Sequence, residues 1–328
     1  MHYDLDFEQE LAAAAEKIRA LQQECNDEAS QQRLDRAISD LQARTKEIYA
    51  QLTSWQTVQV ARHTDRPTTA DYLQAICSDF MELHGDRAFA DDHAVLGGLG
   101  TLGTNTVMFI GQQKGHDMQE KRYRNFGMPH PEGYRKAYRL MTMAEKFNIP
   151  IVCLIDTPGA FPGLEDEEHG QSGAIAANLV LMSRLRVPII SVVIGEGGSG
   201  GALALSVADR LLMLENSVYT VAAPEAAASI LWRDKAFAPE AANTMRISAR
   251  ELCSTKIIDD LVPEPVGGAH HSPHLAAGYL KEKLLMHLDE LQGVTIDELI
   301  ERRYQKYRAI GAFVRVGEAD SFLSDTPT

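Results

Sequence analysis

Apolar residues recur at helical spacing through the first fifty positions of the chain. Successive members of the set lie three or four residues apart, which is typical of helices that pack along one seam. They are Phe7, Leu11, Ile18 and Leu21, then Leu34, Ile38, Leu41, Thr45, Ile48 and Leu52. A polar break at 26–30 separates the two halves and predicts an antiparallel helical hairpin, a unit we place at residues 1–60. Such a hairpin buries only one face by itself, so we expect it to serve assembly.

The following segments predict the sheet of a main body. A capped helix is predicted through 71–85, and residues 93–115 alternate as strand, glycine turn and strand. A unit of helix, Ile-Pro or Val-Pro, strand and glycine loop then occurs twice, with its proline at Pro150 and again 38 residues later at Pro188. The first of these helices starts at about Pro131. Strand–loop–helix units repeated in this way predict an α/β fold with a parallel sheet covered by helices.

The remaining pattern continues this alternation and then becomes helical. Segments 210–214 and 217–225 are strand-like, and 226–232 is helix-like, so we place the main body at 61–270. Two amphipathic helices are predicted at about 274–290 and 295–309. With a polar tail that we expect to fray, they form a C-terminal unit at 271–328.

Charge and cysteine usage narrow the possible functions. The formal net charge of −14 disfavours bulk attraction to nucleic acid or to an anionic membrane. No apolar run approaches the ~20 residues of a membrane span, and the acidic N-terminus does not resemble a signal peptide, so we expect a cytoplasmic or plastid-stromal protein. Cys25, Cys77, Cys153 and Cys253 are far apart, which fits reduced thiols and excludes a zinc ribbon. We therefore expect no metal in this chain.

A glycine-packed loop, GEGGSGGA at 195–202, lies between a predicted strand and a predicted helix. Unpaired amides and the positive end of the helix dipole favour an anionic guest there. A nucleotide-binding P-loop is rejected because Gly201 and Ala202 stand where that motif has Lys and Ser or Thr. The dinucleotide fingerprint G-x-G-x-x-G does fit 195–200, with Glu215 twenty residues on, although it lies on a late strand. A dinucleotide-dependent oxidoreductase therefore stays an alternative.

A second glycine loop, DTPGAFPG at 156–163, also follows a strand, and two facing sets of amides suggest an oxyanion hole. The sequence contains no GxSxG or HExxH motif, and nothing near Ser199 would activate it. Glu196 and the acidic run 165–168 are possible general bases, but a solvated or ion-paired role is the stronger interpretation. Seven Lys or Arg residues within 114–139, among them Lys114 and Arg135, form either an interface or a seat for ligand phosphates.

Six phrases of the sequence together resemble a known family, the alpha subunits of the acetyl-CoA carboxylase carboxyltransferase of bacteria and plastids. The resemblance extends from about residue 5 to 310. The phrases are LHGDRAFADDHAVLGG (83–98), RNFGMPHPEGYRKA (124–137), IDTPGAFPGLEDEEHGQS (155–172), VIGEGGSGGALA (193–204), ASILW (228–232) and PEPVGGAH (263–270). The resemblance implies a crotonase-like spiral of ββα units and an α2β2 assembly with a beta subunit. It also implies transfer of CO2 from carboxybiotin, held on a biotin carboxyl carrier protein that works with biotin carboxylase, to acetyl-CoA. The product is malonyl-CoA for fatty-acid synthesis.

The resemblance also implies roles for particular residues. Negative charge on the biotin ureido oxygen would be met by the amides of Gly200 and Gly201, with the 161–163 turn opposite. Pro162 has no N–H, which leaves Phe161 and Gly163 as donors there. Gly159, Gly197, Gly198, Lys114 and Arg135 are the predicted substrate-binding residues. The beta subunit would supply most of the acyl-CoA site and the zinc ribbon.

The sequence departs from the family pattern at two places, and the first of them keeps a noncatalytic or regulatory paralogue open as a further alternative. The family usually reads PEGCASILW, whereas this chain has Ala226 and Ala227 in place of the glycine and cysteine. Gln112 stands where histidine is usual in the GHQKG phrase. The glycine loops themselves are intact. The acyl-CoA specificity and any regulation are not fixed by the sequence.

Overall fold

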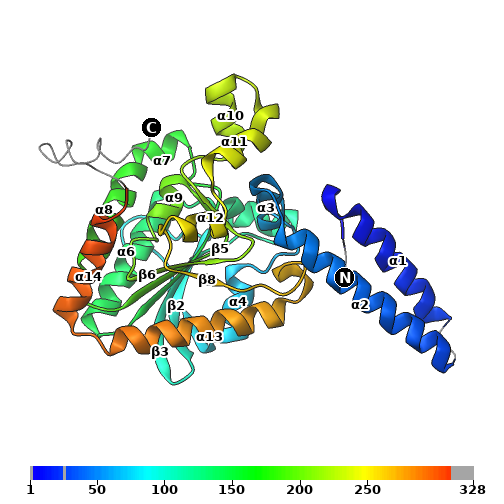
Figure 1. Ribbon diagram of the computed structural model, residues 1–328. Coiled ribbons are helices and arrows are strands. Elements are labelled where there is room, and N and C mark those ends of the chain that lie inside the picture. The colour runs from blue at the N-terminus through cyan, green and yellow to red at the C-terminus, as the bar shows by residue number, and fades with distance from the viewer. Residues whose placement is uncertain (1–2, 25–26, 312–328) are drawn as a thin grey trace, which may run out of the picture.

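The computed structural model describes residues 3–24 and 27–311. Cys25 and the polar tail expected to fray lie outside the described residues. An eight-stranded sheet organises the main body (Figure 1), in the order β1-β2-β3-β4-β5-β6-β8, with β7 paired to the end of β5. The strands are β1 Ser78–Glu82, β2 Val95–Leu102, β3 Asn105–Gln112, β4 Ile151–Thr157, β5 Ile189–Gly198, β6 Arg210–Leu214, β7 Val218–Thr220 and β8 Asp260–Val262. Pairing is antiparallel from β1 to β3 and parallel from β3 onward, which confirms the predicted parallel sheet.

Helices cover both faces of this sheet, so its central strands are buried throughout. In β4, Ile151, Cys153 and Ile155 belong to one apolar cluster, while Val152 and Leu154 belong to the other. Because successive side chains of a strand point to opposite faces, a continuous apolar run is what a sheet covered on both faces requires.

The helices of the main body and C-terminal region are α3 Ser54–Ala61, α4 Thr69–Ile76, α5 Met118–Tyr123, α6 Pro131–Lys146, α7 Leu164–Glu168, α8 Gln171–Arg184, α9 Ser199–Leu203, α10 Pro224–Trp232, α11 Ala238–Met245, α12 Ala249–Ser254, α13 Pro273–Gln292 and α14 Ile296–Arg308, with short 3-10 turns η2 Asn125–Gly127, η3 Lys235–Phe237 and η4 Ala269–His271.

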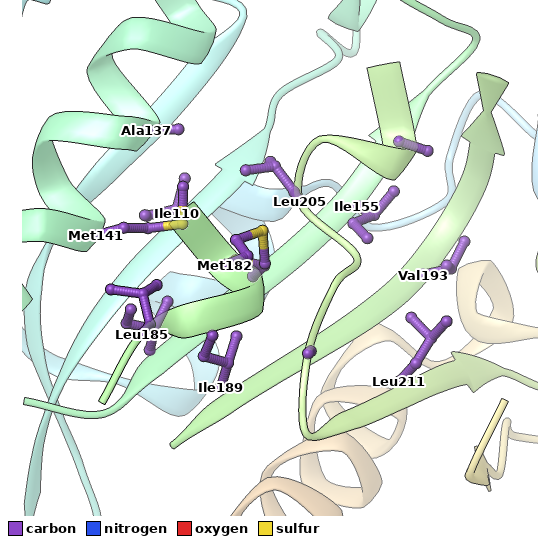
Figure 2. Packing of buried hydrophobic residues seen from close by; sticks show 14 of the residues in the cluster. Ile110, Ala137, Met141, Ile155, Met182, Leu185, Ile189, Val193, Leu205 and Leu211 are labelled. Atoms are coloured by element: carbon purple, nitrogen blue, oxygen red, sulfur yellow. The ribbon is translucent and has the colours of Figure 1, made fainter. Parts of the chain in front are cut away.

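The first face is packed by α6, α8 and the segment after α9. Figure 2 shows Met141 of α6 beside Ile110 of β3, and Met182 and Leu185 of α8 over the neighbouring strands. The sequence places Pro131 at the first turn of α6, where a missing N–H costs nothing, and the helix buries Tyr134, Ala137, Met141 and Ala144. The opposite face is covered by α4 and α13, whose leucines at 280, 284 and 288 are fully buried.

The N-terminal hairpin is present and extends away from the sheet (Figure 1). A 3-10 turn, η1 Asp6–Glu8, leads into α1 Gln9–Gln23, and α2 Glu28–Ala50 returns along it. Asp27 caps α2 by accepting a hydrogen bond of 2.7 Å from the Ser30 amide. The predicted seam forms a separate apolar cluster that includes Leu11, Ile18, Leu34 and Leu41. The role in assembly and the division at 60 and 270 stay predictions.

One prediction of local structure was wrong. The helix expected through 71–85 begins as predicted, with the Thr68 amide donating to Asp71 at 2.7 Å, but it ends at Ile76 and the chain continues as β1. A Cβ added at Gly98 of β2 would overlap the carbonyl of Met81, so the bare backbone of β2 is what allows β1 to approach. This pairing with β2 overrides the helical spacing of the sequence.

Candidate active site

Two glycine loops meet at the carboxyl edge of the sheet. They follow β4 and β5, which are parallel neighbours, so both loops emerge on the same side. A Cβ on Gly201 would lie 2.6 Å from the amide nitrogen of Ala160, and one on Gly198 would overlap the carbonyl of Pro158. The absence of side chains at these two glycines therefore lets the loops pack backbone against backbone.

Open space lies beside this contact. A Cβ on Gly200 would meet only Ile175, at 3.7 Å, and one on Gly159 would meet nothing within 4 Å. The amides of Ser199, Gly200 and Gly201 belong to the first turn of α9, which offers them no intrahelical acceptor. Backbone donors and free space are thus adjacent, which is the arrangement that an oxyanion or a ureido oxygen requires.

The turn at 161–163 is placed differently from what the sequence led us to expect. The Phe161 amide donates to the Pro129 carbonyl at 3.1 Å, so it is already occupied as a donor. The Phe161 ring packs edge-on against His130, with 5.1 Å between ring centroids. Gly163 precedes α7, and a Cβ there would overlap the Asp166 carboxylate. The residues that face Gly201 are Gly159 and Ala160, and the sequence gave no reason to select Ala160.

A cluster of charged side chains, of which two carboxylates are buried and the others half-buried, lies directly behind the loops. The Lys114 ammonium contacts Asp156 Oδ1 at 2.9 Å and Glu196 Oε2 at 2.8 Å. Arg62, at the end of α3, joins Glu196 at 2.6 Å and Glu225 at 2.6 Å. Asp156 also accepts the Glu196 amide at 2.9 Å, which connects the ends of β4 and β5. We call these five residues the loop-end cluster.

The electrostatics of this cluster assign a structural role to its charges. Burial alone would lower the pKa of Lys114, but Asp156 and Glu196 outweigh it and raise this pKa above its ordinary value. Burial would raise the pKa of Glu196, yet Lys114 and Arg62 outweigh it and lower the pKa to about 2. A carboxylate so weakly basic is a poor general base near neutral pH. The ion-paired interpretation of Glu196 is therefore the one that the geometry supports.

The two basic residues predicted to bind substrate are engaged within the chain. Lys114 lies in the loop-end cluster, and Arg135 pairs with Asp86 at 2.8 Å and Glu132 at 2.6 Å. Both positive charges are thus compensated by carboxylates of this protein. Their assignment to ligand phosphates stays a prediction, and any such contact would have to compete with these ion pairs.

The side chain of Gln112 forms one hydrogen bond to each of the two glycine loops and so connects them. Its side-chain nitrogen donates to the Gly201 carbonyl at 3.0 Å, and its side-chain oxygen accepts from the Asp156 amide at 3.2 Å. The side chain is fully buried. A glutamine offers one donor group and one acceptor at opposite corners of its amide, so it can satisfy one backbone group of each loop.

The glycines of the dinucleotide fingerprint are used for packing inside the protein. A Cβ on Gly195 would lie 2.5 Å from Asp156 Oδ1, and one on Gly197 would lie 2.6 Å from the Tyr219 ring. Glu215, the candidate ribose ligand, pairs with Arg250 at 2.7 Å. These glycines make room for protein atoms where the fingerprint needs room for a pyrophosphate, so the geometry disfavours a dinucleotide site.

The alanines that depart from the family pattern lie in α10. Ala227 and Ala228 are buried and pack against Ala241 of α11, while Ala226 is exposed. No residue of the loop-end cluster is displaced by these methyl groups, since Glu225 reaches Arg62 from the same helix. The substitution is accommodated by packing.

Comparisons with known proteins agree with this geometry. A family model described as "Acetyl co-enzyme A carboxylase carboxyltransferase-like" matches residues 4–311. The protein named acetyl-coenzyme A carboxylase carboxyl transferase subunit alpha from Prochlorococcus marinus (strain MIT 9301) is 50% identical over 99% of this chain and 98% of its own length. Its namesake from Staphylococcus haemolyticus is 51% identical over 94% and 99%, respectively.

Solved structures resemble the fold at low sequence identity. A Pseudomonas malonate decarboxylase hetero-dimer gives a TM-score of 0.57 at 19% identity, over 73% of this chain and 94% of that one. A transcarboxylase 12S structure gives 0.53 at 20% identity, over 67% of this chain and 43% of that one, so this chain spans less than half of its length. These likenesses confirm the crotonase-like α/β fold. Within the described residues, no helix combines the length and the apolar character needed to span a bilayer.

Proposed function

This chain belongs to the family of acetyl-CoA carboxylase carboxyltransferase alpha subunits, and on that premise we propose how its own residues take part in making malonyl-CoA. The reaction is the transfer of a carboxyl group to acetyl-CoA by a biotin-dependent transferase. The observation that carries the proposal is the backbone contact of two glycine loops beside open space at one edge of the sheet. Carboxybiotin, delivered by a carrier protein, would supply the carboxyl group.

We assign the binding of the developing negative oxygen to the amides of Gly200 and Gly201. Gly198 and Gly201 let the two loops lie close together, while Gly159 borders the open space and Gly197 makes room for the Tyr219 ring. Gly163 stays the candidate donor on the opposite loop, because the Phe161 amide is held by Pro129. Preorganised amides of this kind typically supply about 10² to 10³ in rate each.

No side chain of the loop-end cluster is assigned to proton transfer in this proposal. Glu196 is held as an anion with a pKa of about 2, and Lys114 keeps its charge between two carboxylates. Their contribution is to fix the ends of β4 and β5, from which the amides project. The chain thus contributes positioned dipoles, and the charges behind them stay constant during the reaction.

We propose that α10 and α11 form the surface to which the beta subunit binds in an α2β2 assembly. This pair of helices stands out from the main body (Figure 1), and it carries apolar side chains that a soluble monomer would not normally expose together. They are Val221, Ile230, Leu231, Trp232 and Phe237, which are between 42% and 81% exposed. The beta subunit would supply most of the acyl-CoA site, and biotin carboxylase would recharge the carrier protein.

The proposed place of action is the cytoplasm, or the plastid stroma. Cys77, Cys153 and Cys253 are free thiols in the structure, which suits a reducing compartment.

The assignment of the amides is tested by two substitutions at one position, Gly200→Ala and Gly200→Pro, in the assembly reconstituted with a beta subunit. Both add a Cβ that meets Ile175 at an ordinary contact distance of 3.7 Å, and only proline removes the N–H. We expect the alanine variant to keep most of the carboxyl-transfer rate, and the proline variant to lose about 10² to 10³. Gly201 is less suitable, because a Cβ there would meet the backbone of the other loop at 2.6 Å.

Two controls accompany this test. Ser199→Ala removes the exposed hydroxyl beside the same amides, and we expect a loss below about tenfold. The mass of the assembly and the thermal midpoint of every variant separate a lost donor from a lost interface. If Gly200→Pro assembles normally and retains the rate of Gly200→Ala, the Gly200 amide does not bind the oxygen.

A further inference from the structure

Away from the glycine loops, the N-terminal segment meets the loop that follows β8. Glu8 of η1 and His270 and His271 of η4 place one ligand atom each within 4.8 Å of one another. Glu8 and His270 are 262 residues apart in the sequence, so the fold alone brings them together. None of the three belongs to the site proposed for carboxyl transfer.

Glu8 is a buried carboxylate that has no cation beside it. Its side chain is completely buried, and its oxygens accept hydrogen bonds from the Tyr49 hydroxyl at 2.6 Å and from the Leu5 amide at 3.1 Å. Both donors are neutral, and no ion pair to Glu8 is found within residues 3–24 and 27–311. A buried charge without a counter-charge is costly, so this position favours a cation.

His270 is half-buried, but its two ring nitrogens are buried and, within the described structure, have no hydrogen-bond partner. Buried polar atoms nearly always have a hydrogen-bond partner. Two buried ring nitrogens without one therefore favour the binding of a ligand at this position. A ring nitrogen that has no hydrogen-bond partner keeps a position at which a metal ion can bind.

The neighbouring His63 is already occupied and is not a fourth ligand. Its ring stacks on His270 with 4.0 Å between centroids, which fixes the plane of the His270 ring. Its Nε2 contacts Asp4 at 2.8 Å, and its Nδ1 accepts from the Asp65 amide at 3.1 Å. Arg66 is neutralised by Glu264, whose Oε2 lies 3.0 Å from its guanidinium.

We propose that Glu8, His270 and His271 bind one divalent cation of the zinc type. Two imidazoles and one carboxylate form a donor set that zinc accepts in proteins, with a water molecule in the fourth position. The Tyr49 hydroxyl and the Leu5 amide would hold the carboxylate from behind, as outer partners of metal ligands do. A cavity of about 510 Å³, lined by His271, Tyr3 and Lys46 among others, gives water and the ion a route to the pocket.

This assignment replaces the expectation, drawn from cysteine spacing, that the chain holds no metal. That spacing excludes a zinc ribbon, but it says nothing about histidine and carboxylate ligands. An ion bound there would cross-link the segment before the hairpin to the main body and close a loop of 262 residues. This cross-link would stabilise the attachment of the hairpin without taking part in carboxyl transfer.

The test uses the full chain without its beta subunit, so that the beta subunit's expected zinc ribbon does not contribute. The chain is stripped with a chelator and titrated with Zn²⁺ against a chromophoric competitor. We expect one equivalent to bind, and Glu8→Gln or His270→Gln to weaken that binding by at least ~100-fold. Glutamine at position 8 can accept from the Leu5 amide with its oxygen and donate its NH2 to the Tyr49 hydroxyl, so it removes the charge and keeps both contacts. The matched control is His274→Gln, an exposed histidine of the same segment, which should bind as the wild type does.

A second measurement keeps the proposal testable if a variant is unstable. Zinc that binds the folded chain alone must raise the thermal midpoint of the wild type in proportion to its affinity, and we expect Glu8→Gln to lose this response. Three results would overturn the proposal: no stoichiometric zinc in the wild type, equal binding in Glu8→Gln and in the wild type, or a metal-free chain in which His271 titrates as an imidazolium paired with Glu8.

Discussion

The loop-end cluster and the Glu8 pocket are two buried groups of charges that differ in how charge is balanced. In the loop-end cluster, each carboxylate has a cation of the chain within 2.9 Å. In the Glu8 pocket, a fully buried carboxylate accepts from a hydroxyl and an amide, and no ion pair to it is found among the described residues. A buried charge that the chain neutralises itself can position the backbone around it, whereas one that it leaves unpaired favours an external cation.

One short segment connects the two groups. Arg62 belongs to the loop-end cluster, and the next residue, His63, stacks on His270 of the Glu8 pocket. Four residues after Arg62, Arg66 donates to the Ile194 carbonyl in β5, just before the glycine loop. The end of α3 therefore contacts both groups, which ties the N-terminal segment to the strand that carries Gly200 and Gly201.

The largest expected effect comes from breaking the balance in the loop-end cluster with Lys114→Met. This substitution keeps most of the side-chain length but leaves Asp156 without a cation and Glu196 with Arg62 alone. Removing one partner of a buried ion pair typically costs about 3 to 5 kcal/mol. We expect the free energy of unfolding, measured with urea on the full chain, to fall by that amount with an unchanged dependence on denaturant.

The matched control is Lys146→Met at the exposed end of α6. Lys146 lies over the Phe147 ring at 5.6 Å, and the change there should stay within about 0.5 kcal/mol. Equal effects at both lysines would mean that Lys114 is not needed to neutralise the cluster, and the contrast with the Glu8 pocket would disappear.

A second prediction tests the difference between the loop-end cluster and the Glu8 pocket through the pH dependence of stability. The carboxyl of Glu196 titrates at about 2 in the folded chain against an ordinary 4.5. Because the folded pKa is lowered, the stability from this group is fully present above about pH 4.5 and is lost as the pH falls toward 2. The shift corresponds to about 3 kcal/mol. Glu196→Gln should therefore be less stable than wild type at pH 7 by this amount, and the difference should shrink in acid.

Urea unfolding of both proteins between pH 7 and pH 3 measures this difference. Glu8→Gln, unfolded in the presence of a chelator, is the matched comparison, because the Glu8 carboxylate forms no ion pair within the described part of the chain. We expect it to be no less stable than the wild type at pH 7 under these conditions. A gap between Glu196→Gln and wild type that stays constant down to pH 3 would contradict the ion-paired role of Glu196.

Much of the fold could be predicted from the sequence, because its signals are local. The apolar runs that end in glycine loops identify β4 and β5, and Pro131 with the apolar face behind it identifies α6. The strand β1 could not be found in this way, since its backbone pairing depends on Gly98, about twenty residues further along the chain. The helical spacing of residues 71–85 is a local signal, so it carries no information about the close approach of β1 to β2.

The candidate site was predictable only in part. The glycines of the sequence predicted the two loops. The contact of Ala160 with Gly201 could not be predicted in this way, because it depends on the register of β4 beside β5. Arg62 gave no signal, because it reaches Glu196 across 134 residues. The Glu8 pocket was hidden for the same reason, and the adjacent pair His270 and His271 was its only trace in the sequence.

The smallest effect concerns Gln112, the neutral bridge between the two loops, and it separates the contribution of hydrogen bonding from that of charge. Gln112→Leu leaves the Gly201 carbonyl and the Asp156 amide without their buried partner, which typically costs about 1 to 3 kcal/mol. Gln112→His places at this position the residue usual in the family, and a neutral imidazole still offers one donor and one acceptor.

We expect the histidine variant to match the wild type in urea unfolding and in carboxyl transfer by the reconstituted assembly. The leucine variant should lose about 10-fold to 100-fold in rate, because small displacements of aligned groups are costly. Neither variant changes the charges of the loop-end cluster, so a loss confined to leucine would show that the loops are aligned by this bridge as well as by ion pairs. Wild-type rates in both variants would instead mean that the ion pairs and the glycine contacts alone hold the amides in place.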